Sequence, residues 1–237
     1  MVVMEESFSK GRQALLIGGT SGIGLSIARR LTAKCASVTV TGRHNPGLPG
    51  ASFIACDFEK NGLEELEEPE LGDALNKCDI VVVSYGPFLK KPVAETSIAD
   101  WRQMALLDYA LPGAVASLVL PGMAARHCGS ILFFGGTRGE DVRSCITNCA
   151  YHGAKTGLNV LVKSIVREYG VQGIACNIVY PGRLDVKGQP FTLNADSIAD
   201  ASMFLIESRF INGAFLNVDK GWIPENTHTY SQVGINL

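Results

Sequence analysis

Short runs of apolar, often β-branched residues alternate along the chain with longer segments of helical periodicity. These runs predict about seven strands, at Ala14–Gly18, Val38–Thr41, Phe53–Ala55, Ile80–Ser84, Ile131–Phe134, Ile174–Val179 and Ala214–Val218. Helices are expected over Ile23–Lys34, Ile98–Arg126 and Ala150–Tyr169, with a further helix opening near Ser197. Residues 80–83 are apolar on both faces, as in strands covered by helices on both sides. The alternation predicts an α/β fold in which residues 1–237 form a single domain around a doubly wound, mostly parallel seven-stranded sheet flanked by helices.

Composition narrows the classes of partner. The chain has 21 basic and 23 acidic residues, which is not the charge balance of a nucleic-acid binder. No apolar run reaches the roughly 20 residues of a membrane span, because Pro112, Pro121 or charges interrupt the longest candidates. Glu5 and Glu6 stand where a secretory signal would be basic. We therefore expect a cytoplasmic protein with a small-molecule partner and no membrane or nucleic-acid partner.

Two further patterns are interpreted as structural. The seven cysteines include no CxxC pair and the histidines do not cluster, so no metal site is expected. Cys145 and Cys149 could share a helical face, but we interpret them as small apolar residues and not as a redox pair. The acidic segment Glu64–Glu70 is interpreted as a solvated surface piece in which Pro69 breaks any helix.

A glycine-rich turn lies between the first predicted strand and the first predicted helix. Residues 18–24 read Gly-Gly-Thr-Ser-Gly-Ile-Gly, with GxxxGxG spacing. Glycine lets the backbone approach a pyrophosphate, and the amino-terminal end of the following helix favours its charge. The turn therefore predicts a dinucleotide cradle formed by Gly18, Thr20, Ser21, Gly22, Ile23 and Gly24. A tight strand–helix turn without a ligand is the alternative.

The end of the second predicted strand bears on the choice of dinucleotide. An acidic residue about 20 residues past such a turn suits the ribose of NAD, whereas an arginine suits the 2′-phosphate of NADP. Here the sequence is Thr41-Gly42-Arg43-His44, without a carboxylate. Arg43 offers a planar, permanently charged fork, so we expect NADP(H) more than NAD(H), with Arg43 and His44 near the phosphate. A solvated surface arginine is the alternative interpretation.

Tyr151 and Lys155 stand four residues apart at the start of a predicted helix, which places both side chains on one face. A free phenol has a pKa near 10. An adjacent ammonium favours the phenolate and lowers that pKa, so Lys155 could tune Tyr151 for acid–base work. Alone, this spacing occurs by chance on many helices, and the glycine turn makes it informative.

Together the glycine turn and the Tyr-x-x-x-Lys helix resemble the short, single-domain form of the short-chain dehydrogenase/reductase family, which has a Rossmann fold. Cys56-Asp57-Phe58 resembles the family's adenine-contacting segment, and the segment ending in Pro181 and Gly182 resembles its turn beside the nicotinamide. The likeness runs through nearly the whole chain. It implies that Tyr151 is the acid/base and that Lys155 holds the nicotinamide ribose and tunes the tyrosine.

The pattern departs from the family at three places. Val83-Ser84-Tyr85-Gly86 replaces the usual Asn-Asn-Ala-Gly, and we expect Ser84 and Gly86 still to contact the cofactor. A glycine stands at the place of the catalytic serine in the segment 133–138, and Thr137 is the nearest hydroxyl. Thr137 either replaces the serine, after a one-residue shift of the loop, or caps a turn. Asp108 aligns with the family's asparagine and either alters a proton relay or satisfies a backbone group in a bent helix.

These expectations favour an NADP(H)-dependent oxidoreductase that interconverts a small carbonyl compound and its alcohol. A dinucleotide-binding protein with weak or no catalysis is the alternative, because the usual serine and asparagine are missing. Sugar-nucleotide epimerase chemistry is less favoured, because the chain leaves little room for a second domain. The resemblance also implies a homo-dimer or homo-tetramer. The segment 183–194 is short for a substrate-covering loop, so the pocket is either open or completed by a partner subunit.

Overall fold

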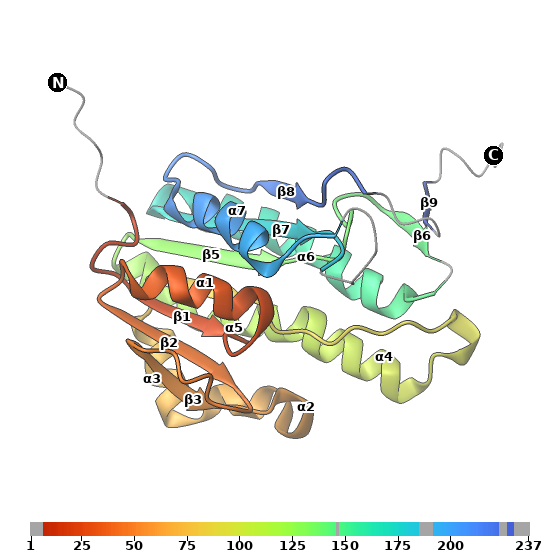
Figure 1. Ribbon diagram of the computed structural model, residues 1–237, viewed down its shortest axis with the longest axis horizontal. Coiled ribbons are helices and arrows are strands. Elements are labelled where there is room, and N and C mark those ends of the chain that lie inside the picture. Colours follow the sequence, from red (N-terminus) through yellow and green to blue (C-terminus); the bar gives the residue numbers. More distant parts are fainter. Residues whose placement is uncertain (1–6, 146, 185–191, 223–226, 230–237) are drawn as a thin grey trace.

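A seven-stranded parallel sheet forms the centre of the fold in the computed structural model, which describes residues 7–145, 147–184, 192–222 and 227–229 (Figure 1). The strand order is β3-β2-β1-β4-β5-β7-β8. The strands are β1 (Gln13–Ile17), β2 (Ser37–Gly42), β3 (Ala51–Ala55), β4 (Ile80–Val83), β5 (Gly129–Phe134), β7 (Ile174–Pro181) and β8 (Phe215–Val218). Each matches a predicted strand to within a few residues, and the predicted doubly wound α/β fold is confirmed.

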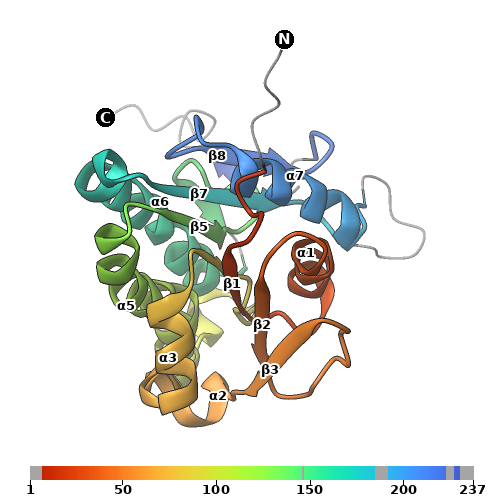
Figure 2. The same cartoon turned by 90° about the vertical axis from the view of Figure 1, so that its left-hand side faces the viewer.

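Helices cover both faces of the sheet (Figure 2). One face carries α3 (Pro69–Lys77), α5 (Leu111–Ala125) and α6 (Cys149–Tyr169), and the other carries α1 (Gly22–Thr32) and α7 (Ala195–Glu207). The remaining helical elements are α2 (Phe58–Asn61), η1 (Gly62–Glu67), η2 (Val93–Glu95), α4 (Ile98–Ala105), the π-helical turn η3 (Leu106–Ala110) and η4 (Gly170–Gln172). The three-layer arrangement explains why the central strands are apolar on both faces.

Alternate residues of each central strand enter different cores. In β1, Leu15 and Ile17 pack with α3, α5 and α6, whereas Leu16 packs with α1 and α7. In β4, all four residues are buried, with Val81 on the first side and Val82 on the second. Burial of apolar surface stabilises a protein by roughly 25 cal/mol per Å². A one-residue shift of a strand would exchange the side chains between the two cores, so this burial fixes the register of the sheet.

The segment Glu64–Glu70 differs from its predicted form. Pro69 occupies the first turn of α3 and begins that helix, because a proline there needs no hydrogen-bond donor. Glu65 is buried, and its Oε1 accepts hydrogen bonds from the Asp57 amide (2.9 Å) and from Asn61 Nδ2 (2.6 Å). Most of this segment is exposed, as expected, but the expectation that Pro69 would break any helix there was wrong.

The helix over Ile98–Ala125 consists of α4, η3 and α5, and it continues through Pro121. Within the described ranges it is the one helical segment that is long and apolar enough to span a membrane. The expectation that proline would exclude such a segment was thus too strict. Half of its most apolar stretch is buried in the structure, as in the core helices of soluble proteins.

A small antiparallel ladder lies outside the main sheet. Strand β6 (Arg143–Cys145) pairs with β9 (Thr227–Thr229), and neither strand was predicted. Three-residue strands carry too little periodicity to be recognised. This ladder lies beyond the carboxyl end of β5, next to the start of α6 (Figure 1).

Candidate functional site

The strand order reverses between β1 and β4, because the chain runs from β1 outward to β3 and then crosses to the other side. In doubly wound sheets, ligands bind outside the carboxyl ends of the strands at such a reversal. A cleft of about 370 Å³ opens there. It brings together ten of the predicted cofactor residues: Gly18, Thr20, Ser21, Gly22, Ile23, Gly24, Arg43, Phe58, Ser84 and Gly86.

The glycine turn leaves room for a ligand close to the backbone. Gly18 (φ +85°) and Gly22 (φ +50°) adopt left-handed conformations that suit glycine. A Cβ on Gly24 would collide with the Gly18 carbonyl and the Ser84 hydroxyl. Ser21 is the N-cap of α1, but its side chain makes no capping hydrogen bond. The first amides of α1 can therefore donate to an anion, which is the arrangement expected of a phosphate cradle.

Ser84 supports this turn from the neighbouring strand. Its hydroxyl donates to the carbonyl oxygens of Gly18 (3.1 Å) and Ile17 (3.3 Å). On the other side, Thr41 Oγ1 accepts from the Gly18 amide at 3.3 Å. The ends of β1, β2 and β4 are thus linked through side-chain hydroxyls.

Arg43 lies at the end of β2, where the sequence predicted a phosphate-binding cation. Its Nη1 is 3.4 Å from Glu59 Oε2, and both side chains are largely exposed. An exposed pair of this kind contributes little energy, so the guanidinium remains able to bind an anion. His44 is exposed and does not line the cleft.

Asp57 and Phe58 follow β3 at the far end of the cleft. Phe58 is buried and packs against Tyr85 with a ring separation of 5.5 Å. Asp57 is the N-cap of α2, and its Oδ1 accepts from the Lys60 amide at 3.3 Å. The cleft is lined by Cys56, Phe58 and Glu59 but not by Asp57 itself.

At its inner end, the cleft reaches a buried ion pair. Lys155 Nζ lies 3.0 Å from Asp108 Oδ1, and the Asp108 side chain is fully buried. A Cβ on Gly86 would collide with that carboxylate and would lie 2.8 Å from Lys155 Nζ, so the pair packs directly against the backbone of Gly86, which lines the cleft. Burial raises the pKa of Asp108, and Lys155 opposes this rise. Asp108 thus pairs directly with the lysine from the π-helical turn η3.

Tyr151 stands one helical turn before Lys155 on α6. Its ring packs edge-on against Phe88 at 4.9 Å, and the Phe88 side chain is exposed. Burial, and to a lesser degree the Asp108 carboxylate, raise the pKa of the Tyr151 phenol. This direction is opposite to the one expected from Lys155 alone, because burial of the phenol dominates its pKa and Asp108 adds to the rise.

The place of the usual serine is occupied by Gly136, whose Cβ would lie 3.2 Å from Tyr151 Cε1. The Thr137 hydroxyl donates instead to the Pro181 carbonyl at 2.7 Å. This bond links the loop after β5 to the end of β7 and uses the donor that Thr137 would need for a substrate. His152 also faces Gly136, with Nδ1 3.6 Å from the same Cβ position.

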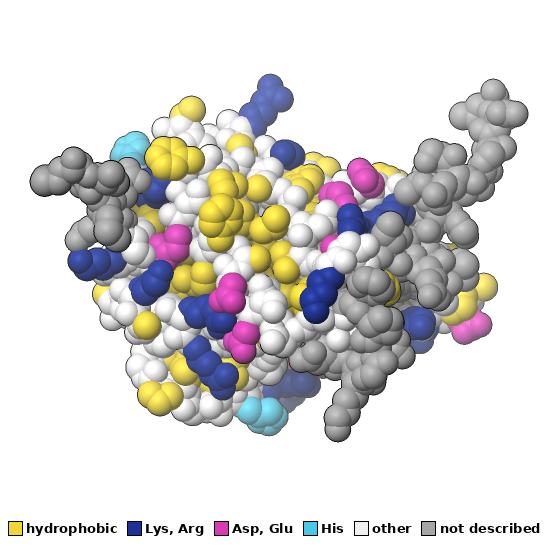
Figure 3. Space-filling model, turned by 45° about the horizontal axis from the view of Figure 1, so that its top comes forward, with side chains coloured by type: hydrophobic (Ala, Val, Ile, Leu, Met, Phe, Trp, Pro, Cys, Tyr) yellow, Lys and Arg dark blue, Asp and Glu magenta, His cyan; other side chains and the backbone are white. Residues whose placement is uncertain are grey.

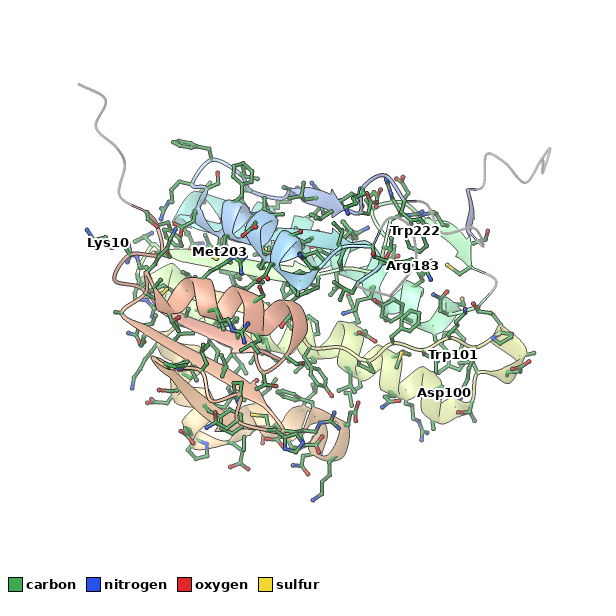
Figure 4. All side chains as sticks on the ribbon, viewed as in Figure 1. Lys10, Asp100, Trp101, Arg183, Met203 and Trp222 are labelled. Carbon is green, nitrogen blue, oxygen red and sulfur yellow. The ribbon has the colours of Figure 1, made fainter. Side chains whose placement is uncertain are left out.

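The end of β7 closes this side of the site. A Cβ on Gly182 would lie 2.7 Å from the Asp219 Cα, so the segments after β7 and β8 pack at backbone distance. Pro181 and Gly182 do not line the cleft of about 370 Å³. Figure 4 shows Arg183 and Trp222 side by side at this end, where the guanidinium lies 5.4 Å from the indole centre.

Three residues near the site were not predicted: Glu59, Phe88 and His152. Glu59 and Phe88 lie in loops or a short helix without periodicity, and only their nearness in sequence to Phe58 and Gly86 could have indicated them. His152 follows Tyr151 directly, but its orientation depends on Gly136, which comes from another element. The expectation that the protein has no metal site is untested. In the part of the chain that is described, no three histidine, cysteine, aspartate or glutamate side chains are grouped so that they could hold a metal ion.

Comparison with known proteins agrees with this geometry. The family model for short chain dehydrogenase matches residues 12–191. A 2-dehydro-3-deoxy-D-gluconate 5-dehydrogenase from Formosa agariphila is 26% identical, over 90% of this chain and 92% of its own. A 3-oxoacyl-(acyl-carrier-protein) reductase, MabA, from Mycobacterium avium is 28% identical over 74% and 68% of the two chains.

A solved structure described as a short chain dehydrogenase/reductase family protein superposes with a TM-score of 0.80 at 27% identity, covering 90% of this chain and 98% of its own. Fold, cleft and comparisons define an oxidoreductase with a Rossmann-type sheet that binds a nicotinamide dinucleotide. The chain belongs to the short-chain dehydrogenase family.

Proposed function

We propose that this protein is an NADP(H)-dependent oxidoreductase that interconverts a small carbonyl compound and its alcohol, with Tyr151 as the acid/base. One observation carries the proposal: the cleft that begins at the glycine turn ends at Gly86, where a side chain would strike the Lys155–Asp108 pair one helical turn from Tyr151. A dinucleotide cradle and a proton-transfer group are thus adjacent.

The residues present fit the dinucleotide. The amides of Gly22, Ile23 and Gly24 would hold the pyrophosphate, and Arg43 would hold the 2′-phosphate that distinguishes NADP from NAD. Ser84, Gly86, Pro181 and Gly182 would border the nicotinamide end, with His44, Asp57 and Phe58 towards the adenosine. When bound, the nicotinamide supplies or accepts the hydride.

Tyr151 would move the proton. Because its pKa is raised, the phenol is protonated at neutral pH and can donate to an oxygen that gains negative charge. This favours reduction of a carbonyl over oxidation of an alcohol, since oxidation needs the phenolate. Lys155 would hold the ribose and limit the rise in the pKa of Tyr151, while Asp108 would keep the lysine in place through its ion pair.

A dinucleotide-binding protein with weak or no catalysis is the second candidate. It is favoured by the missing side chain at Gly136 and by the Thr137 hydroxyl, which is bonded to Pro181. Mixing the protein with NADPH and a panel of ketones, diketones, keto acids and 3-oxoacyl thioesters distinguishes the two. We expect loss of nicotinamide absorbance with at least one class, whereas saturable NADPH binding without turnover of any would favour the second candidate.

We further propose a cytoplasmic homo-oligomer. Large apolar side chains are exposed on α4, η3 and α6, among them Trp101 (42%), Tyr109 (43%) and Val160 (66%). Figure 3 shows another gathering of apolar side chains on the face formed by α7 and β8, and Phe204 of α7 is 61% exposed. Such patches mark association surfaces. Light scattering should give the mass of a dimer or tetramer, and a monomer at micromolar concentration would contradict this.

A further inference from the structure

The space beside Gly136 is where this chain differs most from a site that uses a serine. A Cβ at this position would lie 3.2 Å from Tyr151 Cε1, 3.5 Å from His152 Cε1 and 3.6 Å from His152 Nδ1. Any side chain at this position would therefore start between the phenol ring and the imidazole. With glycine there, no side chain stands between the two rings.

The hydroxyl next in sequence does not fill this role. Thr137 Oγ1 donates to the Pro181 carbonyl at 2.7 Å, and that bond holds two strand ends together. Moving Thr137 towards Tyr151 would break the bond and leave a part-buried carbonyl unpaired, at a cost of about 1–3 kcal/mol. The substrate oxygen thus needs a donor from another residue.

His152 supplies the right chemistry in the right place. Its ring stands edge-on to the Tyr151 ring, with centroids 6.0 Å apart, and no hydrogen bond to the ring exists among the residues described. Burial and the nearby Arg143 cation lower the pKa of the imidazole. A neutral imidazole has one N–H donor and one acceptor, so it can bond an oxygen without a charge of its own.

The backbone fixes this orientation. Asn148, at the N-cap of α6, has a left-handed conformation (φ +79°), and its carbonyl accepts the His152 amide at 2.9 Å. The first turn of α6 therefore turns Tyr151 and His152 together towards the loop after β5. Arg143, from β6, has only 7% of its side chain exposed, and its charge acts on the imidazole.

We propose that His152 is a catalytic residue that donates a hydrogen bond to the substrate carbonyl oxygen beside Gly136. This inference rests on the proposed function. In reduction, hydride adds to the carbonyl carbon, the C=O π pair moves to oxygen, and the Tyr151 hydroxyl supplies the proton that completes the alcohol. The imidazole keeps its own proton and stabilises the negative charge that develops on oxygen.

Three variants test the proposal with whichever carbonyl compound the wild-type protein reduces. His152→Ala should lower kcat about 100-fold, the usual loss when one such donor is removed, while the NADPH Kd changes less than about twofold. His152→Gln, whose amide can donate, should keep at least about tenfold more activity than His152→Ala. Gly136→Ser in the His152→Ala background should restore about tenfold, because it returns a hydroxyl to the same space.

The controls separate chemistry from folding. His127→Asn changes an exposed histidine whose left-handed backbone (φ +50°) asparagine tolerates, and it should leave kcat unchanged. Tm is measured for every variant, and His152→Gln carries the test if His152→Ala does not fold. In ¹⁵N spectra of the wild-type NADP⁺ complex, the His152 ring nitrogens should shift when the alcohol product is added.

Either of two results overturns the role of His152: a kcat for folded His152→Ala within threefold of wild type, or a loss that neither glutamine nor the added serine reduces. In both cases wild-type turnover persists, so the proposed function stands. Wild-type protein that binds NADPH yet reduces no compound would instead contradict the proposed function and, with it, the role of His152.

Discussion

The proposed phosphate cradle and the proposed proton-transfer region lie at the same edge of the sheet but are built differently. The cradle consists of backbone amides and glycines on β1 and α1, held by the hydroxyls of Thr41 and Ser84. The proton-transfer region consists of side chains from η3, α6 and the loop after β5, including a buried ion pair between Asp108 and Lys155. The glycine turn of the first has the spacing of the family, although Ser84 beside it belongs to a segment that departs from the family, and the second departs at Asp108 and Gly136.

This difference follows from what each region must do. A pyrophosphate needs amides at fixed positions, and any glycine turn before a helix supplies them. Proton transfer depends on the charge and reach of a few side chains, which can be exchanged if others compensate. Asp108 changes the charge around Tyr151, and Gly136 removes a donor. We interpret the proton-transfer region as a reorganised active site and the cradle as a feature of the fold.

The largest effect is expected from Tyr151→Phe, which removes the phenolic hydroxyl and keeps the ring packed against Phe88. Removal of a positioned general acid typically costs about 10²- to 10⁴-fold, so kcat should fall about 1,000-fold with the NADPH Kd little changed. Steady-state kinetics on the reduced compound measures this, and Tyr109→Phe on an exposed tyrosine serves as the control. Equal rates for Tyr151→Phe and wild type would remove Tyr151 from the mechanism.

Gly24→Ala tests the cradle. The added Cβ would collide with the Gly18 carbonyl and the Ser84 hydroxyl, which displaces the first amides of α1. Loss of one or two charge-assisted hydrogen bonds corresponds to about a 100-fold weaker NADPH Kd. Gly72→Ala is a matched control, because its Cβ would have no contact closer than 4.0 Å. Unchanged NADPH affinity in folded Gly24→Ala would place the dinucleotide elsewhere.

Arg43→Ala separates the two dinucleotides. It should weaken NADPH binding about 30-fold, since it removes a charged partner of the 2′-phosphate, and should leave NADH binding nearly unchanged. Fluorescence titration of both cofactors gives the ratio, with Arg102→Ala on α4 as the exposed control. Glu59→Gln, which frees Arg43 from its ion pair, should strengthen NADPH binding slightly. An equal loss for both cofactors would refute the specificity role.

Asp108→Asn should produce the smallest change, a shift in pH dependence. The Asp108 carboxylate adds to the rise in the pKa of Tyr151 that burial causes, so its removal lowers that pKa. Alcohol oxidation requires the phenolate, so the rising limb of its pH–rate profile should move to lower pH, and the rate on that limb should increase. A rising limb that stays in place, or moves to higher pH, would show that Asp108 does not act on Tyr151.

The sequence predicted the sheet and the position of the glycine turn well because their signals are local. Residues 80–83 are apolar on both faces, and residues 18–24 form a glycine turn between a strand and a helix. The predicted pKa of Tyr151 had the wrong direction because the pKa depends first on the burial of the phenol. A smaller contribution comes from Asp108, which stands 47 residues before the lysine in the chain and is brought there by η3. The roles of Thr137 and His152 likewise depend on the positions of Pro181 and Gly136, which no local pattern contains.

The helix that begins at Pro69 shows another limit. Proline inside a helical pattern usually ends a helix, but in the first turn it begins one, and only the buried packing of Leu71 and Leu75 decides between the two. Glu65 was misjudged for a related reason, since its two hydrogen-bond partners come from the turn after β3.

The most direct test of the account is calorimetric titration of the wild-type protein with NADPH and, separately, with NADH. The account predicts saturable one-site binding of NADPH that is clearly tighter than that of NADH. No measurable binding of either dinucleotide would contradict the central claim that the cleft binds a nicotinamide dinucleotide.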